Sequence, residues 1–178
     1  QTEEDDILII FTGGTTGVPK ATLLSHKNVV NMCVLESEEM FKKCLEELGF
    51  SGRIKLLADL PPSHVGGTIE LFGVGLVSKS ELIILDHWSP YPVLEITEKE
   101  RIPFIAGVPT MYKILLSLPD LGKYDLAHVK LAFMSGEKVT LDLLKGIRDR
   151  ICRYVVIGYG ATEAGAEVTS TGVLDLNN

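Results

Sequence analysis

The sequence has little positive charge. It carries 17 Lys and Arg residues against 24 Asp and Glu residues, a formal net charge of -7, and its pI is near 5.1. Nucleic-acid binding depends on a clustered positive surface, so this balance argues against a nucleic-acid partner. No apolar run approaches the roughly 20 residues that cross a bilayer, so we expect no transmembrane segment. The oligomeric state cannot be read from these features.

Cysteine is also scarce. Cys33, Cys44 and Cys152 are odd in number and lack the paired spacing of a metal site. This favours reduced thiols in a cytoplasmic protein, with peripheral membrane association of a longer protein left open. The 178 residues, 46% of them hydrophobic, are enough to bury one core, so we expect one domain, residues 1–178.

Two common nucleotide-binding loops are absent. The glycine-rich segment 11–20 reads FTGGTTGVPK and ends at Lys20, which lies between Pro19 and Ala21, so it does not fit G-x-x-x-x-G-K-[ST]. No G-x-G-x-x-G register fits either. Its glycines, hydroxyls and lysine nevertheless suit a phosphate, because glycines let backbone N–H groups approach an anion closely. The alternative is a flexible hairpin tip.

Short apolar runs alternate with helical patterns, which predicts an α/β fold with a mostly parallel sheet flanked by helices. The expected strands are 7–11, 21–24, 55–60, 82–85, 104–107, 130–134 and 154–157. The expected helices are 26–48, 67–77, 90–100, 109–118 and 141–151.

The first predicted helix has clear end signals. Ser25 is a plausible N-cap and Gly49 a plausible terminator. The acidic residues Glu36, Glu39 and Glu46 fall largely off its apolar face, so we interpret this acidic run as a solvated surface.

Three further segments fall at predicted strand ends, where open α/β sheets place ligands. They are LPPSHVGG (60–67), which presents His64, FMSGEKV (133–139), and GYGATEAG (158–165). Taken singly, each has an ordinary structural explanation. A lone histidine, for example, is more often structural than functional.

These segments follow segment 11–20 in the same order as the motifs of a known superfamily. The sequence in this respect resembles the adenylate-forming superfamily of acyl-CoA synthetases, luciferases and peptide-synthetase adenylation domains. FTGGTTGVPK resembles the family loop YTSGTTGxPKG, and Tyr159 to Glu163 resembles Y-G-x-T-E. The segment GVPTMY (107–112) resembles the family's V-P-T segment. The resemblance covers residues 5 to about 165 and implies a subdomain of the large domain, without the N-terminal segment and the C-terminal lid domain.

The resemblance implies a role for each matching residue. Glu163 would bind Mg²⁺, and Lys20, Thr162 and Glu163 would be catalytic. The β- and γ-phosphates of ATP would be held by Thr12, Gly13, Gly14, Thr15, Thr16, Gly17 and Lys20. Adenine would lie against Gly136, Glu137, Gly158 and Tyr159, and the acid would lie near His64, Gly160 and Ala161.

The implied reaction joins a carboxylic acid to AMP, with ATP, Mg²⁺ and coenzyme A taking part. Segment 61–67 has no aspartate to pair with an amino-acid ammonium, so a simple acid, first of all a fatty acid, is favoured. Aryl-acid or luciferase-like activation, and a non-catalytic nucleotide-binding module, are the alternatives.

Some parts of the family pattern are changed or not found. Gly13 and Ser135 depart from the pattern, the latter at the first position of a Gly-Gly pair. The family's ribose-binding aspartate and C-terminal catalytic lysine are not found, so we expect the chain alone to be inactive.

Overall fold

The computed structural model describes residues 2–13, 17–50 and 54–177. Its largest sheet is built on three parallel strands, β5 (Phe104–Gly107), β6 (Leu131–Met134) and β7 (Tyr154–Ala161). β7 continues past its neighbours and pairs with the antiparallel strands β8 (Ala166–Ser170) and β9 (Leu174–Asp175). The predicted parallel core is confirmed, with antiparallel additions that the sequence analysis did not anticipate.

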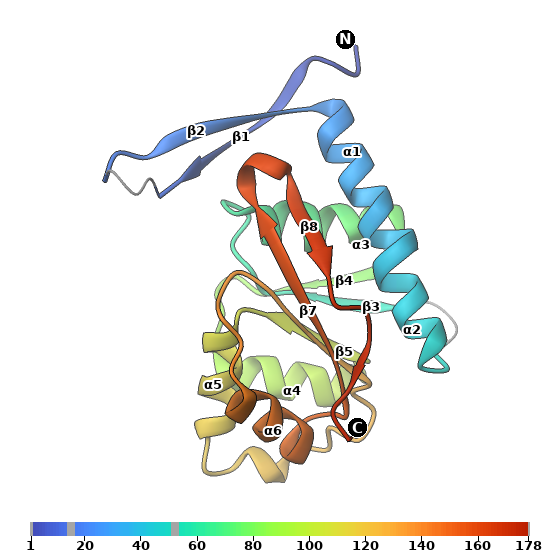
Figure 1. Ribbon diagram of the computed structural model, residues 1–178. Helices are drawn as coiled ribbons and strands as arrows, with labels where there is room; N and C mark the ends of the chain where they lie inside the picture. The colour runs from blue at the N-terminus through green and yellow to red at the C-terminus, as the bar shows by residue number, and fades with distance from the viewer. Residues whose placement is uncertain (1, 14–16, 51–53, 178) are drawn as a thin grey trace.

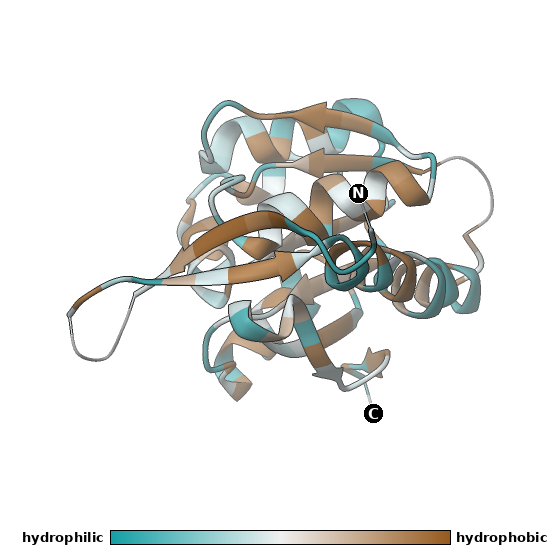
Figure 2. Cartoon of the chain, turned by 90° about the horizontal axis from the view of Figure 1, so that it is seen from above, coloured by the Kyte–Doolittle hydropathy of each residue, from teal (hydrophilic) through white to brown (hydrophobic). Residues whose placement is uncertain are grey.

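The other described strands form two smaller sheets of two strands each. β3 (Lys55–Ala58) and β4 (Glu81–Ile84) pair in parallel, while β1 (Asp6–Thr12) and β2 (Lys20–Ser25) form an antiparallel hairpin. The hairpin projects from the rest of the molecule (Figure 1). Its residues alternate, with Ile10 and Leu24 buried and Ile9 and Leu23 exposed, so one apolar side of the hairpin faces outward. Hydrophobic residues make up much of both strands (Figure 2).

The helix predicted over 26–48 is present as three consecutive parts, α1 (His26–Leu35), the π-helix η1 (Glu36–Lys42) and α2 (Lys43–Glu47). Ser25 caps its start, because the Ser25 hydroxyl accepts from Asn28 N at 3.3 Å and the Asn28 side chain accepts from Ser25 N at 3.1 Å. Gly49 ends it with a φ of 75°.

The other predicted helices lie close to their expected positions. They are the π-helix η2 (Gly66–Gly73) with α3 (Val74–Val77), α4 (Pro90–Glu100), α5 (Pro109–Ser117) and α6 (Leu141–Arg150). Two short 3₁₀ turns, η3 (Leu121–Lys123) and η4 (Thr162–Ala164), were not predicted. Figure 1 shows α4, α5 and α6 at one end of the molecule and the hairpin at the other.

The main core lies between the parallel strands and α5 and α6. It includes Tyr112, Met134, Ile147 and Val155, all fully buried. In the part of the chain that the structure describes, no helix is both long and apolar enough to cross a membrane. All three cysteines are free thiols, as predicted.

Candidate active site

A cavity of about 570 Å³ opens where the parallel strands end. The cavity is lined by Gly107 at the end of β5, by Ser135 and Gly136 after β6, by Gly160 and Ala161 at the end of β7 and by Thr162 just after it. This is the edge at which open α/β sheets bind ligands. The apolar part of the wall comes from both π-helices and the strands: Met40, Phe41, Leu56, Leu71, Phe104 and Leu131.

The described residues of the predicted phosphate loop include the end of β1, at Thr12, and the start of β2, at Lys20. Thr12 and Lys20 face each other across the β1–β2 hairpin, and the Thr12 hydroxyl donates to the Lys20 carbonyl at 3.4 Å. Lys20 is exposed and forms no ion pair with any described residue, so its ammonium is free to meet an anion. Gly17 has a φ of 80°, which favours glycine. The predicted ligands Gly14, Thr15 and Thr16 lie outside the described residues.

The second signature segment meets the first. Thr162 and Glu163 lie in η4, at the bend between β7 and β8, and η4 contacts β2 of the hairpin. Gly165 ends this bend with a φ of 93°, and a side chain there would approach Met32 of α1. Segments about 140 positions apart in the sequence therefore lie together, with Thr162 on the cavity wall (Figure 1).

A magnesium ion fits this bend only as a partner of a nucleotide. No three His, Cys, Asp or Glu side chains among the described residues are placed to hold a metal ion. The Glu163 carboxylate is exposed and has no ion-pair partner in the described chain. Mg²⁺ commonly binds one or two carboxylates and fills its other positions with water and phosphate oxygens, which is the arrangement Glu163 could offer.

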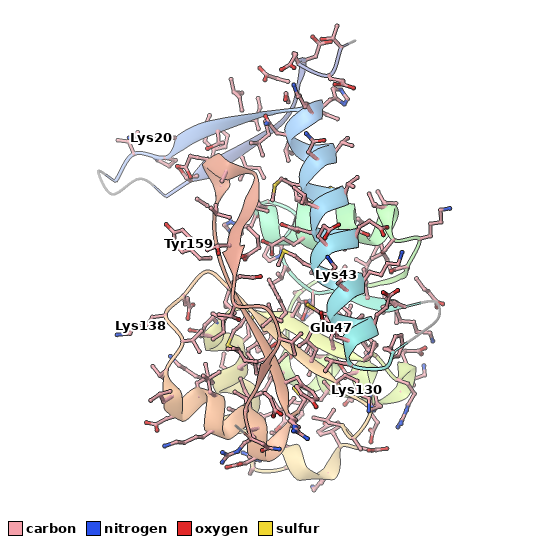
Figure 3. All side chains as sticks on the ribbon, turned by 45° about the vertical axis from the view of Figure 1, so that its right-hand side comes forward. Lys20, Lys43, Glu47, Lys130, Lys138 and Tyr159 are labelled. Carbon is pink, nitrogen blue, oxygen red and sulfur yellow. The ribbon has the colours of Figure 1, made fainter. Side chains whose placement is uncertain are left out.

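The predicted adenine residues are distributed over β7 and the turn after β6. The Tyr159 ring is 67% exposed and lies on the same side of the molecule as Lys20 in Figure 3. Gly136 has a φ of 82° and lines the cavity. The Glu137 carboxylate accepts from the Thr110 hydroxyl at 2.7 Å and from Thr110 N at 3.2 Å, so this side chain holds the start of α5.

Gly158 has a structural reason to be glycine. A Cβ atom at this position would lie 2.2 Å from both carboxylate oxygens of Glu167 on β8. Gly160 is equally restricted, because a Cβ there would lie 2.3 Å from the Ala166 carbonyl oxygen. Both glycines therefore allow β8 and its side chains to pack closely on β7.

His64 and its neighbours form the entrance that was expected for the acid. His64 lies on an exposed turn between β3 and η2, where its backbone N–H donates to the Pro61 carbonyl at 3.1 Å. His64, Gly160 and Ala161 all line the same cavity. The structure therefore brings these three predicted residues together.

The sequence analysis missed three carboxyl groups on the cavity wall, Glu36, Glu70 and Glu167. The interpretation of the acidic run as a solvated surface is wrong for Glu36, which is 5% exposed, although Glu39 and Glu46 are exposed as expected. The π-helical turn that begins at Glu36 accounts for the error, because wider turns shift side chains relative to a 3.6-residue period. Single acids inside apolar segments, such as Glu70 in TIELFG, were the available signal.

Burial dominates the electrostatics of these groups. It raises the pKa of Glu36 to about 8, with Glu70 and Glu167 adding repulsion and the Glu167 N–H opposing the shift. Burial raises the pKa of Glu70 to about 7, with repulsion from Glu167. The pKa of Glu167 is also raised, chiefly by burial.

With this geometry established, comparison with known proteins identifies the family. The sequence matches the AMP-binding enzymes over residues 1–177. The chain belongs to the AMP-binding enzyme family. Among similar AMP-binding enzymes is a long-chain-fatty-acid–CoA ligase of Bacillus subtilis, 30% identical over 91% of this chain and 28% of the ligase. Another is the medium-chain acyl-CoA ligase ACSF2 of Danio rerio, 32% identical over 90% of this chain and 26% of that protein.

Solved structures of this family share the fold. An ATP-bound MatB from Rhodopseudomonas palustris matches with a TM-score of 0.81 and 26% identity, over 97% of this chain and 32% of MatB. The N-terminal domain of FACL13 from Mycobacterium tuberculosis matches with a TM-score of 0.76 and 23% identity, over 91% of this chain and 38% of that chain. The chain thus spans less than a third of the length of the curated AMP-binding relatives described above.

Proposed function

We propose that the protein containing this chain activates a carboxylic acid with ATP and transfers the acyl group to coenzyme A. The observation that carries this proposal is the contact between β2 and η4 beside the cavity. One nucleotide could there meet the phosphate loop through Lys20 and the second signature through Thr162 and Glu163. An acid in the cavity would meet its α-phosphate.

The proposed reaction has two steps. A carboxylate oxygen attacks the α-phosphorus of ATP, and the bond to the β-phosphate breaks, which releases pyrophosphate and leaves an acyl-adenylate. A thiol of coenzyme A then attacks the acyl carbonyl and releases AMP. Both first-step reactants are anions, so the protein's main task is to neutralise charge and align the reactants.

The residues divide this task. Lys20 would neutralise the departing pyrophosphate, and the Thr162 hydroxyl would donate to the α-phosphate. Glu163 would hold Mg²⁺, which when bound neutralises phosphate charge. The exposed ring of Tyr159 would offer a face to adenine.

The cavity supports a substrate with an apolar chain. Its volume of about 570 Å³ lies within the range of small-molecule sites, and Phe41, Leu56 and Phe104 contribute apolar walls. The relatives named above include a long-chain and a medium-chain ligase, which favours acids of the fatty-acid type as the substrate class.

The test is exchange of labelled pyrophosphate into ATP by the full-length protein, measured with and without a panel of carboxylic acids. Acid-dependent exchange supports the proposal, and coenzyme A should then yield acyl-CoA and AMP. Nucleotide binding without exchange for any acid would instead indicate the non-catalytic module.

Lys20→Ala tests the phosphate loop within the same assay. Removal of the cation should lower exchange by at least about 100-fold, because a preorganised charge on the transition state is lost. Lys130→Ala is the matched control, since Lys130 is an exposed lysine far from the hairpin (Figure 3). Near-full exchange in Lys20→Ala would remove Lys20 from the mechanism.

A further inference from the structure

Phe41 of η1 lies between two cavities. One is the cavity of about 570 Å³ described above, and the other has a volume of about 400 Å³ and is lined by residues of η1 and α2 and by neighbouring loops. Among the described residues, no other residue lines both cavities. Phe41 is therefore the residue that separates them.

The second cavity, which we call the outer cavity, reaches the surface. Its wall includes the exposed charged residues Glu38, Lys42 and Lys79. Leu45 and Phe50 add apolar surface to the same wall. An alkyl chain that passed Phe41 would thus find further apolar surface there, and burial of that surface would favour its binding.

The Phe41 ring is held in place by Phe104. The two ring centroids lie 4.6 Å apart at an interplanar angle of 74°, which is an edge-to-face contact. Phe104 is 5% exposed and forms a buried cluster with Leu56 and Leu131, against which Phe41 also packs. A chain that pushed the ring aside would break these contacts, so the ring resists displacement.

Phe41 lies at the end of the first cavity that is opposite the reacting groups. Phe104, which contacts Phe41, begins β5, whereas Gly107 ends β5, and both line the cavity. Three residue steps of about 3.3 Å place Phe104 and Gly107 about 10 Å apart. Thr162 lines the cavity just after β7, which runs parallel to β5 and β6, so the substrate carboxylate is expected at the Gly107 end.

We propose that Phe41 sets the upper limit on the length of the acyl chain that this protein activates. An extended octanoyl chain is similar in length to the distance from Gly107 to Phe104, so it ends against the Phe41 ring. A hexadecanoyl chain has to continue into the outer cavity, and the ring closes that route. This inference rests on the proposed function and narrows its substrate class to acids of medium chain length.

The neighbouring wall residues do not share this position. Met40 and Cys44 line the first cavity from the same continuous helix, but neither lines the outer cavity. A smaller side chain at either position would enlarge the first cavity without joining it to the outer one. Only the loss of the Phe41 ring is expected to open a continuous path.

The test measures pyrophosphate exchange by the full-length protein with octanoic and hexadecanoic acid, and the ratio of the two kcat/KM values is the acid preference. Wild type should favour octanoic acid by at least about tenfold, because the longer chain must displace a packed ring. In Phe41→Ala the preference should shift toward hexadecanoic acid by at least about tenfold. Wild-type use of hexadecanoic acid as well as or better than octanoic acid, or an unchanged preference in Phe41→Ala, would overturn the inference.

Phe50→Ala is the matched control, because Phe50 lines the outer cavity and not the first one. It removes the same ring but leaves Phe41 in place, so the acid preference should stay that of wild type. An equal shift in Phe50→Ala and Phe41→Ala would overturn the assignment to Phe41. If Phe41→Ala does not fold, Phe41→Leu replaces it, with a smaller shift expected in the same direction and an unchanged preference counting against the inference.

Binding separates this inference from the proposed function. If no acid supports exchange, the proposed function fails, and calorimetry with octanoic and hexadecanoic acid then decides the inference. Relative to octanoic acid, hexadecanoic acid should bind Phe41→Ala at least about tenfold more tightly than it binds wild type. The same relative affinity in wild type and Phe41→Ala would show that Phe41 does not limit chain length.

Discussion

Two buried polar regions of this molecule differ in how their groups are satisfied. In the main core, the fully buried Tyr112 hydroxyl lies 2.6 Å from the Ile105 carbonyl oxygen and 2.9 Å from that of Phe133, and can donate to either. In the cavity, the Glu167 carboxylate is almost as deeply buried, and its pKa stays raised by burial although the Ser135 side chain and the Tyr159 backbone act to lower it. The difference teaches that burial alone does not mark a functional group.

Each arrangement has a different physical consequence. The Tyr112 hydroxyl joins β5 to β6 through their backbones, so its role is complete within the protein. Burial raises the pKa of Glu36 and Glu70, with repulsion from Glu167 adding to both shifts, so a proton stabilises each of these buried acids. Three predictions test this contrast.

The largest expected effect is on the pH dependence of stability. The pKa of Glu36 rises from its usual 4.5 to about 8 in the folded protein, so over this pH range the folded state keeps a proton that the unfolded state loses. Stability is therefore greatest below the lower value and falls as pH rises through the upper one, by a contribution on the order of a few kcal/mol. Glu36→Gln should remove this contribution, so its stability advantage over wild type should grow with pH.

Chemical denaturation at a series of pH values measures this difference. Glu47→Gln, an acid-to-amide change on the exposed side of α2, is the control. Glu70 and Glu167 remain in the variant, so some fall in stability persists. A constant difference between Glu36→Gln and wild type at every pH would mean that the pKa of Glu36 is the same in the folded and unfolded states, and would contradict the prediction.

The next largest effect is expected on the stability of the main core, where the Tyr112 hydroxyl has its hydrogen-bond partners. Tyr112→Phe removes the donor shared by two buried carbonyl oxygens, and we expect a loss of about 1–3 kcal/mol in the free energy of unfolding. The acid preference should not change, since the hydroxyl serves the core. Urea denaturation and the exchange assay measure the two properties.

Tyr91→Phe is the matched control for this substitution. Its hydroxyl is exposed and donates to Asp120 at 3.3 Å, so the same chemical change there removes only a surface contact. Equal destabilisation by the two variants would mean that the Tyr112 hydrogen bonds do not stabilise the core.

Much of the fold could be predicted because local signals agreed with the tertiary structure. β5 and α4 begin and end where predicted, since Pro and Ser mark the start of α4 and a short apolar run defines β5. β8 was missed because its stability comes from pairing with β7, which depends on the small size of Gly160. That requirement is visible only when both strands are in place.

The site was predictable where its residues form motifs. Lys20, Thr162 and Glu163 were recognised from their surrounding sequence, and the contact of β2 with η4 brings their segments together. Their roles in the reaction stay predictions. Glu36 and Glu70 could not be found in this way because each lies in a π-helical segment, where the usual helical period misplaces side chains.

The smallest effect is expected on the solvated side of the helix that carries Glu36. Lys43 pairs with Glu39 at 2.7 Å, and their side chains are 61% and 60% exposed. Water and salt screen such a pair, so Lys43→Ala should leave the midpoint of thermal unfolding unchanged within error and should not alter acid preference. Lys43→Arg keeps the charge and serves as the control. A clear fall in the midpoint for Lys43→Ala but not for Lys43→Arg would mean that the exposed charge of Lys43 contributes to stability. The buried charge of Glu36 and the exposed charge of Lys43 would then differ only in the size of their effects on stability.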